Sequence, residues 1–234
     1  METTQNSGNV LRMKYSNLIL SIETSSNTCG IALSSNGDVI SEYSYFAKNN
    51  HDKLLAEYFS RTLIDSEIQI TDLDAIALST GPGSFTGIRI GSAFVKGLLF
   101  GSKVKFIAVP TLESLQSASL EFAKSLQKDV IASYIKSHKD LYFYQEFNLS
   151  TLIRTEIEII EENNLKERLS KDVIYAGNYN LNFEQLKTLS GLQKLTPRFV
   201  AKRAYEKFTQ NEFDDIESYT PLYQLDFTPK TKVF

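Results

Sequence analysis

The 234-residue sequence has little of the chemistry that metal centres and disulfide scaffolds need. It contains one cysteine, Cys29, two histidines, His51 and His138, and no tryptophan. A single thiol forms neither an internal disulfide nor a cysteine-built zinc site, and two histidines are few for a His-ligated metal. We therefore expect no metal site in this chain, and we interpret Cys29 as a small buried hydrophobe.

The sequence also lacks a surplus of positive charge and long apolar runs. Its 25 basic and 28 acidic residues give a net charge of −3, and no segment concentrates the charge that independent nucleic-acid binding requires. No apolar run approaches the about 18 residues of a membrane-spanning helix, and the polar residues 1–17 lack the apolar core of a secretory signal. We expect a cytoplasmic protein with no membrane contact, which would meet any RNA through another protein.

The first half of the chain predicts the element order β-β-β-α-β-α-β-α. The pair Asn36-Gly37, between two apolar runs, is a strong signal for a type I′ hairpin, and apolar residues three and four apart indicate helices. The predicted strands are Leu18–Ile22, Gly30–Leu33, Val39–Phe46, Asp74–Ser79 and Val104–Val109, and the predicted helices are Leu54–Leu63, Thr86–Phe100 and Leu112–Leu126.

The second half repeats this order without repeating the sequence. It predicts strands at Val130–Ile135, Leu141–Phe147, Leu152–Ile160 and Val173–Ala176, and helices at Leu165–Leu169 and Pro197–Phe208. Two hairpin sheets extended by parallel strands and right-handed crossover helices indicate two ribonuclease-H-like lobes in an α/β protein.

We divide the chain into three parts on this basis. Residues 1–16 are expected to be a disordered extension, of which 1–12 are polar and aperiodic, with Met13 an alternative start. Residues 17–115 form the first lobe, completed by 205–234, and residues 116–204 form a degenerate second lobe.

The most informative stretch is GPGSFTGIRIG at 81–91, which follows a predicted strand and opens a predicted helix. In this setting backbone N–H groups converge on an anion. The stretch is not a P-loop, because Ile88 stands where the lysine would be, and G-x-G-x-x-x-G is one residue too long for a dinucleotide fingerprint. On spacing alone, an anion loop and a tight turn with close helix packing both stay open.

Three segments together resemble the TsaB (YeaZ) family: LSIETSS at 20–26, DLDAIA at 72–77 and the glycine stretch at 81–91. Its members are the dimerisation subunits of the bacterial tRNA threonylcarbamoyladenosine machinery. The resemblance is specific over 18–115 and weak beyond. It implies an actin/Hsp70-like (ASKHA) fold and pairing with the catalytic paralogue TsaD. With the ATPase TsaE, that pair transfers a threonylcarbamoyl group to the adenosine beside the tRNA anticodon.

The sequence departs from TsaD at the positions that hold the metal and nucleotide there. The resemblance places the H-x-x-x-H pair of TsaD at Thr111–Leu115, and an acidic pair at Ser26–Thr28, and neither motif is present. Both departures remove charge that a metal–nucleotide site needs. We predict a non-catalytic scaffold that binds no cofactor by itself, with ATP and a divalent metal in the partner subunits and tRNA bound through the complex.

Candidate site residues lie around the glycine stretch. Glu23 matches the acidic residue that nucleotide-binding members of the fold hold near a phosphate-bound metal, and Arg89 is interpreted as a structural ion pair at the lobe interface. The residues assigned to a possible nucleotide site or lobe interface are Glu23, Gly81, Pro82, Gly83, Ser84, Thr86, Gly87 and Arg89.

A partner surface is predicted on the first two helices. The helix after the glycine stretch is apolar around much of its circumference and needs a second cover, and Gly91, Ser92, Ala93 and Gly97 would let another helix approach. In the family these two helices meet their counterparts in the partner as a bundle. We predict this interface, homodimeric without a partner, at Leu54, Leu55, Tyr58, Ile90, Phe94 and Gly97.

Two alternatives stay open. A stand-alone actin-like ATPase or kinase would need two acidic metal-binding positions, and only Glu23 is well placed. A glycoprotease-type metallopeptidase would need paired zinc histidines, which the sequence lacks.

Overall fold

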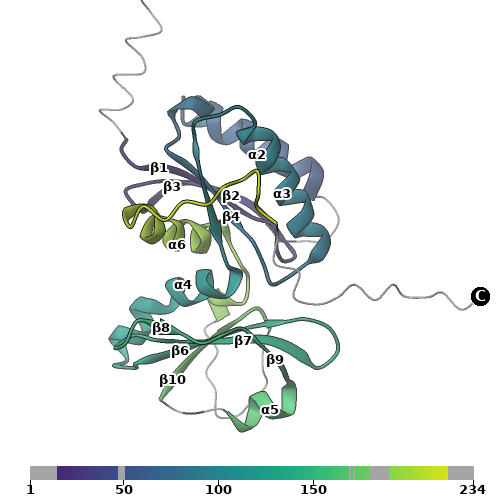
Figure 1. The fold of residues 1–234 in the computed structure, drawn as a ribbon, viewed down its shortest axis with the longest axis vertical. Coiled ribbons are helices and arrows are strands. Elements are labelled where there is room, and N and C mark those ends of the chain that lie inside the picture. Colours follow the sequence, from purple (N-terminus) through teal and green to yellow (C-terminus); the bar gives the residue numbers. More distant parts are fainter. Residues whose placement is uncertain (1–14, 47–50, 169, 171, 180–189, 221–234) are drawn as a thin grey trace, which may run out of the picture.

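The computed structural model describes residues 15–46, 51–168, 170, 172–179 and 190–220. The predicted extension lies outside this range except for its last two residues, as does the part of the closing segment after 220. Two five-stranded sheets form two lobes, with helices between them (Figure 1). Over the described ranges, every helix is too short or too polar to cross a membrane.

The first sheet has the order β3-β2-β1-β4-β5, in which β1, β4 and β5 run parallel. Both β1 and β4 are buried along their whole length, as near-continuous apolar runs predict. The type I′ hairpin is confirmed, because Asn36 and Gly37 have φ of 52° and 86°. The strands are β1 Leu18–Glu23, β2 Thr28–Ser35, β3 Asp38–Phe46, β4 Ala75–Ser79 and β5 Lys105–Val109.

Helices cover both faces of the first sheet (Figure 1). Helices α2 (His51–Asp65) and α3 (Phe85–Leu99) pack on one face, and α6 (Pro197–Thr209) packs on the other. Alternation along β1 explains the division, because Leu20 belongs to the core under α2 and α3 while Ile19 belongs to the core under α6. A short 3-10 helix, η1 (Ile70–Asp72), precedes β4.

Ser16, the last residue of the predicted extension, is bonded to the β2–β3 hairpin. Its carbonyl accepts a hydrogen bond from the Asn36 amide at 3.1 Å, and its amide donates to Ser35 Oγ at 3.2 Å. The chain is therefore attached to the β2–β3 turn before β1 begins.

The second sheet has the order β10-β6-β7-β8, with β9 also paired to β7. The strand predicted over Leu152–Ile160 is two short strands instead. The register changes by one residue between the pairs Phe147–Arg154 and Tyr144–Glu158, which is the mark of a bulge. The strands are β6 Val130–Lys136, β7 Leu141–Asn148, β8 Ile153–Arg154, β9 Glu158–Glu161 and β10 Val173–Gly177.

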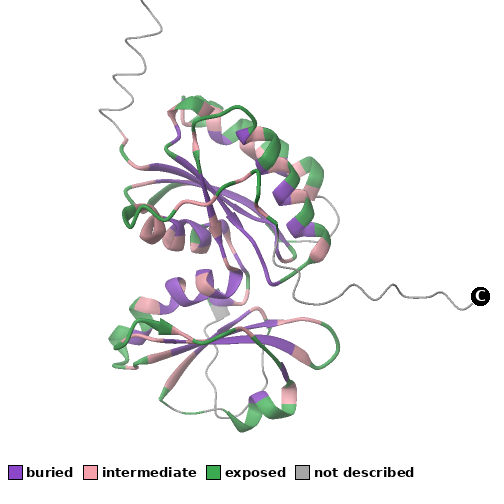
Figure 2. Cartoon of the chain, viewed as in Figure 1, coloured by how far each residue is buried: buried purple, intermediate pink, exposed green. Residues whose placement is uncertain are grey.

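Two helical segments complete this lobe. Helix α5 (Glu162–Glu167) begins three residues before the predicted Leu165, with the Glu162 carboxylate in its first turn, where the helix dipole favours negative charge. A 3-10 turn, η2 (Ser190–Leu192), precedes α6. Burial follows the two sheets and the helix faces that cover them (Figure 2).

The two lobes meet where α4 (Thr111–Ser125) packs against α6. Leu112 and Leu115 of α4 share a core with Phe143 of the second sheet, whereas α6 lies on the first sheet. The predicted domain boundaries stay predictions. These contacts group α4, beginning at Thr111, with the second lobe, whereas the predicted first lobe extends to residue 115. They group α6, beginning at Pro197, with the first lobe, whereas the predicted closing segment begins at residue 205.

An ion-pair cluster joins the two helices. Arg203 Nε of α6 donates to Glu113 Oε2 of α4 at 2.8 Å, and their side chains are only 11% and 18% exposed. Arg203 also pairs with Glu206 at 3.1 Å, and Glu206 accepts from Ser117 Oγ at 3.1 Å. Because these charges are largely buried, loss of Glu113 would leave Arg203 with Glu206 as its remaining carboxylate partner in the cluster.

We expect Glu113→Gln to lower the free energy of unfolding by about 1–3 kcal/mol, because Arg203 would then face a neutral amide. The control is Glu121→Gln on the same helix, whose carboxylate is 71% exposed and 3.7 Å from Lys124 and whose loss should stay within about 0.5 kcal/mol. Denaturant unfolding measures both, and equal effects would contradict the role of Glu113.

Candidate functional site

The candidate site lies where the three parallel strands of the first sheet end. Glu23 closes β1, Ser79 closes β4, and Thr111 follows β5 by two residues. Parallel strands that end at one edge bring the loops after them together, and ligands of open α/β sheets bind outside such edges. The sequence-predicted Glu23 and the glycine stretch therefore do meet in space.

Glu23 lies at the centre of a buried polar cluster. Its side chain is 0% exposed, and its Oε1 accepts hydrogen bonds from the amide and Oγ of Ser25, both at 2.7 Å. Ser25 Oγ in turn accepts from Ser79 Oγ at 3.0 Å and from Thr111 Oγ1 at 3.2 Å. Burial raises the pKa of Glu23, and the hydrogen bonds from Ser25 oppose that shift in part.

The loop after β4 is held by the same cluster. Gly81 has φ of 100°, a backbone conformation that glycine adopts readily and other residues rarely do, and the Gly81–Pro82 peptide is cis. The Gly81 amide donates to Thr111 Oγ1 at 3.1 Å, and its carbonyl accepts from the Thr111 amide at 2.7 Å. Ser84 caps α3, because its Oγ accepts from the Gly87 amide at 3.3 Å.

Gly83 and Gly87 are required for close approach and not for an unusual φ. A Cβ on Gly83 would lie 2.1 Å from the Ser25 carbonyl oxygen, and a Cβ on Gly87 would lie 1.9 Å from that of Thr24. The Ser84 amide also donates to the Ser25 carbonyl at 2.6 Å. Of the two interpretations that spacing left open, this packing supports the tight turn with close helix contact.

The small residues of α3 point in different directions. A Cβ on Gly91 would lie 2.4 Å from Thr24 Oγ1, and Ser92 is 6% exposed. Both therefore pack within their own lobe, which corrects the expectation that they admit a partner helix. Ala93 is exposed, and a Cβ on Gly97 would meet nothing within 4 Å. These two residues therefore leave space for a partner helix to approach.

The other predicted residues are spread over the surface and the core. Pro82 is buried, Thr86 is exposed, and Arg89 is exposed with its guanidinium 4.4 Å from the centroid of the Phe85 ring. The lobe-interface ion pair assigned to Arg89 stays a prediction. Cys29 is buried, and burial raises the pKa of its thiol to about 12.

The predicted partner residues differ in exposure. Leu54, Tyr58, Ile90 and Phe94 are half-buried, and the ring of Phe94 lies edge-on to Phe59 with centroids 5.7 Å apart. Leu55, at 1% exposure, belongs to the core of its own lobe and cannot face a partner directly. This assignment was wrong because Leu54 and Leu55, adjacent on a helix, point about 100° apart.

Sequence reasoning missed the hydroxyls that hold this site. Ser25, Ser79 and Thr111 each lie at or just beyond the end of an apolar strand, and that position was the available signal. They bond to one another and to Glu23, where a metal site would need a second acidic ligand. In the described part of the chain, no three His, Cys, Asp or Glu side chains could hold a metal ion together. The strand ends bring one buried carboxylate to this edge, that of Glu23, whose Oε2 has no hydrogen-bond partner among the described residues.

Two ribonuclease-H-like lobes that meet where α4 packs against α6, a contact called the helical seam below, define a protein of the actin/Hsp70-like fold class. Its structure resembles YeaZ from Pseudomonas aeruginosa with a TM-score of 0.71 and 21% identity, over 88% of this chain and 99% of that one. A family model described as TsaD, tRNA N6-adenosine threonylcarbamoyltransferase, matches residues 43–189.

Sequence relatives narrow the assignment. The tRNA threonylcarbamoyladenosine biosynthesis protein TsaB of Bacillus subtilis is 30% identical over 162 residues, 68% of this chain and 70% of that protein. TsaB of Haemophilus influenzae is 29% identical over 127 residues, 54% of this chain and about half, 52%, of the relative. The chain belongs to the TsaB family.

The close approach of Gly83 predicts a large cost for any side chain there. We expect Gly83→Val to lower the free energy of unfolding by about 2–4 kcal/mol, because the valine Cβ overlaps the Ser25 carbonyl. Gly97→Ala, at a helical position with open space, should instead stabilise by up to about 1 kcal/mol. Denaturant unfolding at low protein concentration tests both, and a loss under about 0.5 kcal/mol for the valine variant contradicts the close packing.

The raised pKa of Glu23 predicts that the free energy of unfolding falls as the pH rises. Above the ordinary value of 4.5, the folded state keeps a proton that the unfolded state has lost, so stability falls as pH rises toward the folded pKa. The free energy of unfolding of Glu23→Gln should equal that of the parent near pH 4 and should exceed it at pH 8 by about 1 kcal/mol or more.

Thermal and denaturant unfolding at both pH values measure this difference. Glu57→Gln serves as the control, since this carboxylate is 48% exposed in a surface pair with Arg61 and should leave the slope unchanged. A Glu23→Gln variant that is less stable than the parent at pH 8 would refute the assignment.

Proposed function

We propose that this chain is a non-catalytic scaffold subunit in tRNA threonylcarbamoyladenosine biosynthesis and that it pairs with a TsaD-type catalytic subunit. Membership of the TsaB family supports a role in this biosynthetic process. The observation that carries the scaffold role is the filled site at the strand ends, where Glu23 is 0% exposed and bonded to Ser25.

A catalytic or metal-binding carboxylate must be open to its ligand, whereas the Glu23 side chain is 0% exposed and its Oε2 is buried without a hydrogen-bond partner among the described residues. Its Oε1 is engaged by two donors from Ser25, and the backbone at Thr24 and Ser25 lies against Gly87 and Gly83 with no room for one additional carbon atom. This packing supports a scaffold over the alternative of a stand-alone ATPase or kinase.

The proposed partner surface is the α2–α3 face. Leu54, Tyr58, Ile90 and Phe94 form a half-buried apolar group there, next to Gly97, where another helix has space to approach. We place the TsaD-type subunit on this face, and a second copy of the chain when that subunit is lacking. A TsaE-type ATPase and tRNA would join through the complex in the cytoplasm, with ATP and a divalent metal in the partner subunits.

Reconstitution with the TsaD-type and TsaE-type subunits of the same organism tests the role. Mass spectrometry of nucleosides from the product tRNA measures threonylcarbamoyladenosine. We expect modification to require the chain and to survive Glu23→Gln, because a scaffold needs no ionised carboxylate there. Loss of modification with a folded Glu23→Gln variant, or micromolar Mg-ATP binding with turnover by the chain alone, would favour the ATPase alternative.

Phe94→Glu tests the partner surface. A carboxylate buried in an apolar interface should weaken association by about 2–4 kcal/mol while the circular dichroism spectrum stays that of the parent. The matched control is Phe122→Glu on α4, where the ring is 45% exposed and association should not change. Analytical ultracentrifugation, alone and with the TsaD-type subunit, measures the effect; an unchanged complex would refute this surface.

A further inference from the structure

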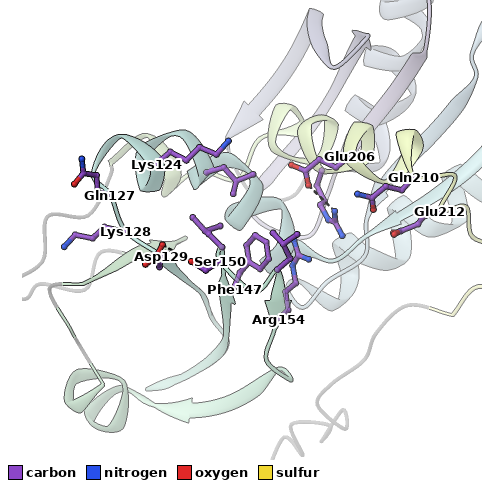
Figure 3. Close-up of a pocket in the computed structure, with 14 residues that line it drawn as sticks. Lys124, Gln127, Lys128, Asp129, Phe147, Ser150, Arg154, Glu206, Gln210 and Glu212 are labelled. Carbon is purple, nitrogen blue, oxygen red and sulfur yellow. Dashed lines mark hydrogen bonds and ion pairs between the residues drawn. The ribbon is translucent and has the colours of Figure 1, made fainter.

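A cavity of about 1010 Å³ lies between the lobes, on the helical seam and away from the strand-end site. Helix α4 and the β7–β8 hairpin form its walls from the second lobe, and the last turns of α6 close it from the first (Figure 3). Cavities of this size at the junction of two domains are the usual sites for small molecules.

Arg154 of β8 is held rigidly in this cavity. Its guanidinium lies 4.1 Å from the centroid of the Phe147 ring, and its Nε donates to Gln116 Oε1 at 2.9 Å. Gln116 is itself fixed, because its Nε2 donates to Ser133 Oγ at 2.9 Å and to Gln145 Oε1 at 3.2 Å. The planar group is thus oriented before any ligand arrives.

The terminal amino groups of Arg154 are left for a ligand. Its nearest carboxylate oxygen, Glu113 Oε2, is 3.8 Å from Nε and is already bonded to Arg203 at 2.8 Å. No described residue accepts a hydrogen bond from the terminal amino groups of Arg154. Burial lowers the pKa of Arg154, and the Glu113 carboxylate opposes that shift. A ligand carboxylate would supply two charge-assisted hydrogen bonds to the terminal amino groups.

Leu152 lies on the same β7–β8 hairpin as Arg154, and its backbone is conformationally strained. Leu152 lines the cavity with φ of 59° and 72% of its surface exposed. A leucine is unfavourable in this left-handed region, where asparagine or glycine is tolerated. Asn148 fixes the turn, since its Oδ1 accepts from the amides of Ser150 and Thr151 at 3.0 and 2.9 Å. An exposed, strained leucine adds little to the fold, which fits a role in contacting a ligand.

We propose that this cavity binds a small organic molecule that carries one carboxylate on an apolar body. Arg154 takes the carboxylate, and Leu120, Leu149 and Leu152 take the apolar part. The other charged residues of the lining balance one another, since three are acidic and three are basic: Asp129, Glu206, Glu212, Lys124, Lys128 and Arg203. The single charge of Arg154 therefore matches a carboxylate better than a doubly charged phosphate.

Octanoate is a suitable probe, tested by isothermal titration on the full chain. We expect saturable binding below about 1 mM, at least about tenfold tighter than 1-octanol or octyl phosphate. Arg154→Lys keeps the charge but loses the planar fork, and it should weaken binding about tenfold. Arg168→Lys, at an exposed second-lobe arginine paired with Glu158 outside the cavity, should leave binding unchanged.

Leu152→Asn separates a ligand-binding role from a structural one. Relief of the left-handed strain should raise the melting temperature by about 2 °C, while loss of the apolar side chain weakens octanoate binding severalfold. No saturable octanoate binding, equal effects of the two arginine variants, or unchanged affinity in a folded Leu152→Asn variant would each overturn the proposal. None of these results bears on pairing with a TsaD-type subunit, which the α2–α3 face tests separately.

Discussion

The close contact between the start of α3 and the backbone after β1 sets most of the first lobe. Gly83 and Gly87 lie against the carbonyls of Ser25 and Thr24 with no space for a side chain. This contact fixes the direction of α3 on the sheet and leaves Phe94 on its outer surface. It also brings the glycine stretch against the backbone that follows Glu23, so the same glycines shape both the lobe and the strand-end cluster.

The seam between the lobes combines apolar packing with buried charge. Helix α4 shares its core with the second sheet, α6 shares its core with the first, and Arg203 and Glu113 connect the two helices. Breaking a buried pair costs more than a surface pair because each charge has lost its water. The contact between α4 and α6 therefore couples the lobes and also lines the open cavity in which Arg154 is oriented.

The sequence predicted most of the elements because their signals are local. The hairpin at Asn36-Gly37, the helices α2 and α3, and the buried strands followed from turn chemistry and periodicity. The strand over 152–160 failed because a bulge between β8 and β9 depends on pairing with β7, which periodicity does not record. The prediction that Leu55 belongs to the partner interface failed for a related reason, since adjacent helical residues face different neighbours.

The sequence by itself determined the fold class, the family and the glycine stretch, because the backbone needs of a strand–turn–helix are written in consecutive residues. Only the tertiary structure decided which contacts this stretch makes. Thr111 lies 86 residues from Ser25, and Arg203 lies 90 residues from Glu113. Contacts over such distances depend on how three strand ends and two helices converge in space, so no local pattern could reveal that Glu23 is sealed or that Arg154 faces a cavity.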